Sequence, residues 1–265
     1  LPAEVAEAIV AFYADRDYAP FWTEDAGARA QALLAALEGA GAQGLPAGAY
    51  DAPALDAALK AADPDAWLRA EALASTAYLV HARHLAGGLL TPSSVDPEIN
   101  IRPARPAAGA LLDRLDTGNV DAVLAALAPA SPEYARLIAE KARLEGLMRA
   151  DPWGAGVPEG PTLREGDTDP RVADLRARLA RMGYGAAPDE PGTDPARFDT
   201  ALTAAVQAFQ RDSGLLDDGA AGARTLRALN AGPEARLRQV LVNLERLRWQ
   251  GNTREERYIE VNIPD

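Results

Sequence analysis

The sequence has 265 residues, of which 48% are hydrophobic and 25% are charged, an ordinary composition for one large or two small globular domains. It carries 27 basic against 39 acidic residues, a net charge of −12, so it would repel phosphate groups, and we expect no nucleic acid partner. Cysteine is absent, which excludes disulfides, thiolate nucleophiles and iron–sulfur clusters. Because no run of about 18 apolar residues occurs, we expect no membrane insertion.

Residues 1–150 show mainly the spacing of apolar residues that is typical of helices. The helices predicted from this spacing cover residues 5–13, 33–37, 64–86, 111–115, 120–127 and 132–148. Gly39 follows the second of these helices, and we expect it to end that helix in the left-handed conformation. In the third helix Trp67, Tyr78 and His81 share one stripe that should face the core. The proline-rich stretch 91–106 is predicted to be irregular.

A break in composition follows this helical part. Residues 151–161 contain three prolines and three glycines, so we interpret residues 151–162 as a linker. Residues 163–230 then show a compact pattern of three helices. The first of these begins with Asp169 as its N-cap and Pro170 at its first position.

The last part of the chain, residues 233–265, begins with a strongly amphipathic helix. Its stripe of Leu237, Leu241 and Leu244 should pack back onto residues 1–150, because large apolar side chains are costly to leave in water. The alternating residues 258–263 predict one strand without a partner in the sequence. The expected fold is therefore mainly α, a helical domain with an inserted three-helix domain and one orphan C-terminal strand.

Spacing alone identifies no catalytic residue in this chain. His81 and His84 are the only imidazoles; a shared metal is geometrically possible, but their helix stripe favours a core role, so we expect no metal and no cofactor. The aromatic cluster 18–22 could stack on a sugar, but a core-packing corner is the favoured interpretation. Acidic pairs such as Asp217/Asp218 are common in so acidic a chain, and none is distinguished as a glycosidase pair.

Residues 163–229 resemble a family through the sequence AVQAFQ at 205–210, followed by Gly214-Leu215 and by DGAAG at 218–222. This pattern is similar to the three-helix peptidoglycan-binding domain, whose helix stripes and glycines coincide with it over some sixty residues. It departs from the family at Ala220 and Ala221, where one larger apolar residue is usual, so looser packing is expected there. The resemblance implies peptidoglycan as the partner, through its glycan strand or its stem peptide.

Within this domain four polar residues near the loops are the candidate ligand-binding residues: Gln210, Arg211, Asp218 and Thr225. The alternative is that they cap helices and turns, and for Asp218 and Thr225 this alternative is favoured.

The segments on either side resemble the large L,D-transpeptidases of Gram-negative periplasms. The matching segments are residues 12–23, 40–50, 87–96 and 127–134 for the scaffold domain, and 243–249 and 257–264 for the entry into the catalytic domain. The resemblance implies a periplasmic protein that forms 3→3 cross-links, in which a cysteine attacks a diaminopimelate carbonyl of a stem peptide. Because the sequence starts at Leu1 rather than at Met, we expect that an N-terminal piece has been removed, and a secretion signal would fit this expectation.

The family's catalytic motif, of the type Ser-His-Gly-Cys-x-Arg, does not occur here. We therefore expect a fragment that is non-catalytic and consists of the scaffold domain, 1–150, the linker, 151–162, the binding domain, 163–230, and the segment 233–265. Two alternatives stay open: a stand-alone, non-enzymatic cell-wall-binding protein, and the binding module of a cell-wall hydrolase, an amidase or a carboxypeptidase.

Overall fold

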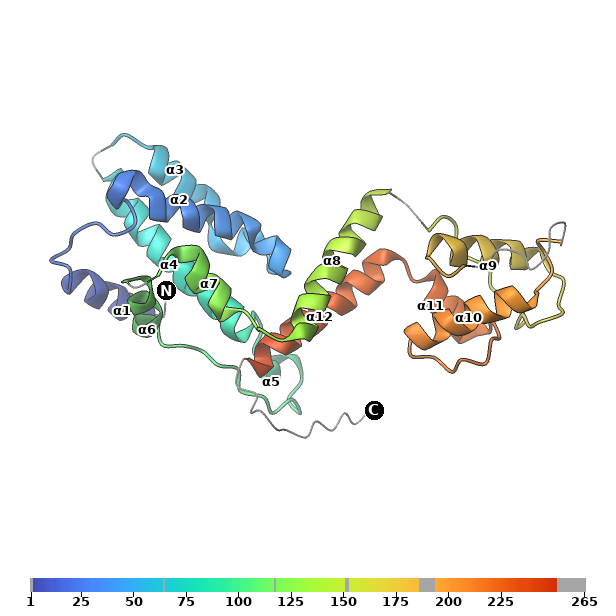
Figure 1. Ribbon diagram of the computed structural model, residues 1–265. Helices are drawn as coiled ribbons and strands as arrows, with labels where there is room; N and C mark the ends of the chain where they lie inside the picture. The colour runs from blue at the N-terminus through green and yellow to red at the C-terminus, as the bar shows by residue number, and fades with distance from the viewer. Residues whose placement is uncertain (1, 64, 117, 151–152, 186–193, 252–265) are drawn as a thin grey trace. The chain divides into compact units, whose positions relative to one another are not determined.

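The computed structural model describes residues 2–63, 65–116, 118–150, 153–185 and 194–251. Figure 1 shows its α-helices, which are α1 (Ala3–Ala14), α2 (Glu24–Glu38), α3 (Ala52–Lys60), α4 (Ala66–Gly87), α5 (Pro92–Val95), α6 (Ala108–Asp113), α7 (Val120–Leu127), α8 (Pro132–Ala150), α9 (Pro170–Arg181), α10 (Thr200–Asp212), α11 (Ala223–Asn230) and α12 (Pro233–Gln250). Three short 3₁₀ helices complete the set: η1 (Gly39–Gln43), η2 (Ala47–Tyr50) and η3 (Arg114–Asp116).

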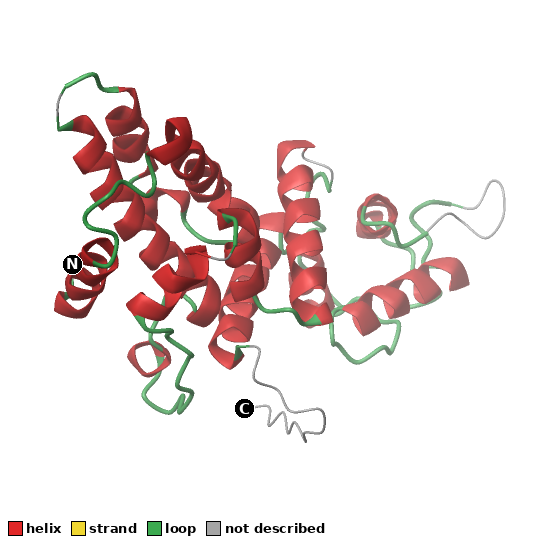
Figure 2. Cartoon of the chain, turned by 60° about the vertical axis from the view of Figure 1, so that its left-hand side comes forward, coloured by secondary structure: helices red, strands yellow, loops and turns green. Residues whose placement is uncertain are grey.

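These elements confirm the prediction of a mainly α fold. Over the described ranges Figure 2 shows helices joined by loops and no strand, and the only ladder contacts there are two isolated bridges, Leu163 with Ala221 and Thr168 with Arg197. The strand predicted at residues 258–263 lies outside the described residues.

The chain divides into two compact units. The first contains residues 1–141 and the chain from Val240 onward, and the second contains residues 142–239. The second unit is thus inserted in the sequence of the first. The domain boundaries given above from the sequence remain predictions.

In the first unit α4 is the central helix and contacts α2, α3, α6 and α7. Tyr78 and Leu79 are fully buried on it, and His81 is 3% exposed. The prediction that Trp67 belongs to this buried stripe is wrong, because its residue is 46% exposed. Ala66 and Ala70 occupy the buried face at the start of α4 instead.

The end of α2 also differs from the prediction. The helix ends at Glu38, but Gly39 has right-handed angles, φ −77° and ψ −3°, because the chain continues directly into η1. The left-handed residue is Gly44, with φ +71°. A Cβ at Gly44 would lie 2.9 Å from Cδ2 of Leu241, so glycine is required there by both conformation and space.

Two of the three aromatic residues of the corner, Phe21 and Trp22, belong to the core, which agrees with the favoured interpretation for these two residues. Trp22 is fully buried and Phe21 is 6% exposed, whereas Tyr18 is 65% exposed. The corner is held by Glu71 of α4, whose carboxylate accepts hydrogen bonds from the backbone N–H groups of Phe21 and Trp22 at 3.1 and 3.0 Å.

The second unit is built on α9, α10 and α11, with Phe198 and Phe209 fully buried between them. Asp169 caps α9 by accepting the N–H of Arg171 at 2.9 Å, and Pro170 follows it, as predicted. Asp199 caps α10 in the same way, accepting the N–H of Leu202 at 2.9 Å.

Part of the predicted linker packs against these helices. Trp153 is 4% exposed and Val157 is 2% exposed. The buried guanidinium group of Arg178 donates to the carbonyl oxygens of Trp153 and Gly154 at 3.1 and 2.9 Å. The described part of the linker is therefore anchored to the second unit.

Candidate functional site

A groove with a volume of about 360 Å³ lies in the second unit, where the loop after α10 meets the first turn of α11. It is lined by Thr162, Arg164, Gln210, Leu215, Leu216, Asp218, Ala220, Gly222, Ala223, Arg224 and Thr225. Figure 1 shows α10 and α11 close together in this part of the chain. Three of the four residues predicted from the sequence line the groove, and Arg211 does not.

The buried side chain of Gln210 fixes the loop 217–222, which forms one wall of the groove. Its residue is 1% exposed, and its Nε2 donates to Asp218 Oδ1 at 2.9 Å and to the carbonyl oxygen of Ala220 at 3.0 Å. Nε2 also donates to Thr225 Oγ1 at 3.1 Å, while Oε1 accepts the N–H of Gly219 at 2.9 Å. The amide of Gln210 thus has protein partners on both of its polar atoms and joins the loop 217–222 to α10 and α11.

Asp218 and Thr225 complete this network. Asp218 Oδ1 accepts the N–H of Ala220 at 3.0 Å, and this bond, together with the one from Gln210, lowers the pKa of the carboxyl group. Thr225 is 6% exposed, and its hydroxyl donates to the carbonyl oxygen of Ala220 at 3.3 Å. Both side chains therefore make the turn-capping contacts of the alternative interpretation, and whether they also touch a ligand stays a prediction.

The side chain of Arg211 lies on the surface and does not line the groove. It is exposed, and its Nη1 lies 3.3 Å from Oδ2 of Asp217 in a surface ion pair. Exposed pairs of this kind contribute little to stability. The structure therefore does not bring Arg211 together with the other three candidates.

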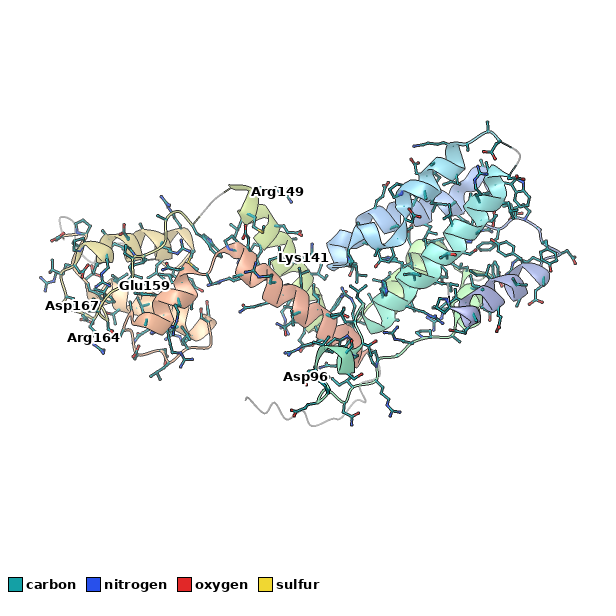
Figure 3. All side chains as sticks on the ribbon, turned by 180° about the vertical axis from the view of Figure 1, so that it is seen from behind. Asp96, Lys141, Arg149, Glu159, Arg164 and Asp167 are labelled. Atoms are coloured by element: carbon teal, nitrogen blue, oxygen red, sulfur yellow. The ribbon has the colours of Figure 1, made fainter. Side chains whose placement is uncertain are left out.

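Two other arginines that the sequence analysis did not select do line the groove. Arg164 lies on the loop before α9, where its backbone N–H donates to Asp167 Oδ2 at 2.8 Å, and Figure 3 shows these two residues side by side. Arg224 lies in the first turn of α11, immediately before Thr225. Its place between Gly222 and Thr225 of the sequence motif is the signal that could have identified it.

The glycines and alanines of the loop set the shape of the groove. Gly219 has φ +73°, and a Cβ there would lie 2.8 Å from Cγ2 of Thr203, so the turn requires glycine. Ala220 is 6% exposed and Ala221 is fully buried. The backbone of Ala221 exchanges two hydrogen bonds with Leu163, at 2.9 and 3.2 Å, which ties the loop to the start of the domain.

The two histidines belong to the first unit and form no such groove. His81 is 3% exposed, its Nδ1 has no hydrogen-bond partner, and burial lowers its pKa to about 4. His84 Nδ1 lies 3.2 Å from the hydroxyl of Tyr50. Over the described ranges no group of three histidine, aspartate or glutamate residues is placed to hold a metal ion. Within the same ranges no helix is long and apolar enough to cross a membrane.

Comparison with known proteins adds two matches. Residues 168–229 match the family of the peptidoglycan binding domain, and these residues include Gln210, Asp218, Arg224 and Thr225 of the groove. Residues 7–140 match the scaffold domain family. No curated protein matches the chain.

The two matched families, in this order, fit the N-terminal part of an L,D-transpeptidase-like protein. The second match also makes peptidoglycan a supported partner of the chain and the cell wall a supported location. The scaffold match covers residues 7–140, which is 134 of the 265 residues and thus half of the sequence. The chain belongs to the scaffold domain family.

Proposed function

We propose that this chain is the substrate-holding part of a periplasmic L,D-transpeptidase that forms 3→3 cross-links in peptidoglycan. The observation that carries the proposal is the groove of about 360 Å³, which lies in the segment matching the peptidoglycan binding domain. The scaffold match over residues 7–140 supports the transpeptidase context. The residue-by-residue resemblance given in the sequence analysis supports it as well.

The construction of the groove suits a ligand that is held without being changed. Its wall is fixed by the buried amide of Gln210, so little order has to be gained when a ligand binds. The exposed lining residues are Thr162, Leu216, Asp218, Ala223 and the two arginines at 164 and 224. Such a surface supplies apolar contact and hydrogen-bond donors, which together position a polymer at modest affinity.

The chemistry of cross-linking requires a thiolate nucleophile, and the 265 residues contain no cysteine. The role proposed for these residues is therefore binding and orientation of the wall. Mixed with disaccharide-tetrapeptide, the chain should form no 3→3 dimer, and mass spectrometry should show no carbapenem adduct. An adduct would contradict this assignment.

Co-sedimentation of the full chain with purified sacculi tests the binding role. We expect part of the chain to pellet with sacculi at low and at moderate salt. Ala223→Trp places a large ring in the groove at an exposed position and should abolish pelleting. Arg227→Trp, an exposed position on the same helix that does not line the groove, is the matched control and should pellet like the wild type.

Two results would contradict the proposal. One is a wild-type chain that stays in the supernatant at both salt concentrations. The other is an Ala223→Trp variant that has the circular dichroism spectrum of the wild type and pellets equally well, because binding would then take place elsewhere.

A further inference from the structure

We propose that the groove recognises the carboxylate-bearing end of a peptidoglycan stem peptide, with the guanidinium groups of Arg164 and Arg224 as the recognition elements. This inference rests on the proposed function and goes further, because it chooses the stem peptide over the glycan strand and names the two residues that make the choice. Neither arginine was among the candidates taken from the sequence.

The first support is that both guanidinium groups are exposed and make no ion pair with the described residues. Both residues are exposed and line the groove, and within the described parts of the chain neither forms an ion pair. Other arginines of the same unit are engaged by the protein itself: Arg171 with Asp169, Arg176 with Asp199, Arg178 with backbone carbonyl oxygens and Arg211 with Asp217. Arg164 and Arg224 therefore keep their planar sets of donors for a ligand.

The second support is the local charge. The groove lining holds two arginines and one acid, Asp218, in a chain whose net charge is −12. The Asp218 carboxylate already accepts from Ala220 and Gln210, and Arg164 contributes to lowering its pKa without an ion pair. The neighbouring Asp167 accepts the backbone N–H of Arg164 rather than its side chain. The lining is thus locally cationic, and arginine pairs well with carboxylates because its fork of donors matches their two oxygens.

The third support is the kind of apolar surface in the groove. It is aliphatic: Leu215 is half-buried and Leu216 is 79% exposed, and none of the described residues that line the groove is aromatic. A sugar ring would be expected to stack on an aromatic face, which this groove does not offer. A stem peptide offers alanine methyl groups and free carboxylates instead. The aliphatic wall and the two arginines match both of these features.

Isothermal titration of the full 265-residue chain with a synthetic stem tetrapeptide, L-Ala-γ-D-Glu-diaminopimelate-D-Ala, tests the inference. A tetrapeptide amidated at all its carboxyl groups and an uncharged N-acetylglucosamine oligomer serve as comparison ligands. We expect the free acid to bind at least tenfold more tightly than the amide. Arg164→Gln and Arg224→Gln should each weaken binding of the acid about tenfold, and the control Arg211→Gln should leave it within twofold.

The outcomes separate this inference from the proposed function. Equal affinity for acid and amide, tight binding of the oligomer alone, or full affinity in the Arg164→Gln, Arg224→Gln double variant would overturn the inference. If wild-type chain still pelleted with sacculi, the proposed function would stand in each of these cases. A wild-type chain that bound neither the tetrapeptide nor sacculi would overturn both.

Discussion

Each of the two units uses one buried polar side chain on a helix to hold a loop, and the two residues differ in what they hold. Glu71 of the first unit is 2% exposed and fixes the corner at residues 21–23. Gln210 of the second unit is 1% exposed and fixes the loop 217–222. The corner held by Glu71 places Phe21 and Trp22 in the core, whereas the loop held by Gln210 forms one wall of an open groove.

The difference shows that a buried hydrogen-bond hub does not by itself mark a binding site. A charged hub such as Glu71 needs many donors to balance the loss of water, and it receives five, from Tyr13, Phe21, Trp22 and twice from Thr23. A neutral amide needs fewer partners, so the surface beside it can stay open. The site is identified by what remains uncommitted around the hub, here Arg164, Arg224 and Leu216.

Removal of Glu71 should have the largest effect on stability. Glu71→Ala leaves the buried N–H groups of Phe21 and Trp22 and the half-buried N–H of Thr23 without their acceptor, and we expect a loss of about 4 kcal/mol in the free energy of unfolding. Urea unfolding followed by circular dichroism measures it, with the exposed Glu7→Ala as control. A loss below about 1 kcal/mol would contradict a structural role for this carboxylate.

The first unit should also be the acid-sensitive one, because His81 is buried there. Burial lowers the pKa of His81 to about 4, whereas an unfolded chain titrates near the ordinary value of 6.5, so between these values the unfolded state binds more protons. Stability should therefore fall as the pH drops from about 6.5 to about 4, by about 3 kcal/mol.

Unfolding free energies of the wild type and His81→Gln, measured across this range, check the effect. The variant should lose most of the pH dependence above pH 4.5, while His84→Gln should keep most of it. Hydrogen exchange should locate the acid-induced opening in α4 rather than in α9–α11. Equal pH dependence in His81→Gln and the wild type would contradict this assignment.

Gln210→Ala should have a smaller effect on stability and a clear effect on binding. It removes the acceptor of the Gly219 N–H and one donor to the Ala220 carbonyl oxygen, for which we expect a loss of about 2 kcal/mol. Because the wall of the groove loosens, less chain should pellet with sacculi. Arg227→Ala, at an exposed position of α11 that does not line the groove, is the control and should stay within about 0.5 kcal/mol of the wild type. Unchanged pelleting of folded Gln210→Ala would show that the wall does not contribute to binding.

The sequence was sufficient for those features that depend on local pattern. Helix periodicity predicted α1, α4, α8 and α12, and the Asp169-Pro170 pair predicted the start of α9. The short helix α3 was not predicted, and the exposure of Trp67 and the conformation of Gly39 were predicted wrongly, because each depends on which neighbour packs against it.

The groove could likewise be predicted from the sequence only where its residues belong to a local motif. Gln210, Asp218 and Thr225 could be chosen because they stand at polar positions of a recognisable motif. Arg164 stands 46 residues before Gln210 in the sequence, and tertiary contacts such as the one between Leu163 and Ala221 bring its loop to the groove. Arg211 had the right charge and the right neighbour in sequence, but its side chain pairs with Asp217.

Leu216 provides the test with the smallest expected effect on stability. It is 79% exposed, so Leu216→Ala removes almost no buried surface and should change the free energy of unfolding by less than about 0.5 kcal/mol. The same side chain lines the groove, and a ligand that covers it should gain about 1 kcal/mol from apolar contact, so the variant should bind the stem tetrapeptide about fivefold more weakly. Val242→Ala, at another exposed apolar residue, is the control for surface hydrophobicity. If Leu216→Ala bound the tetrapeptide like the wild type, the apolar wall would have no part in recognition. Binding in the groove of the second unit would then depend on the two arginines alone.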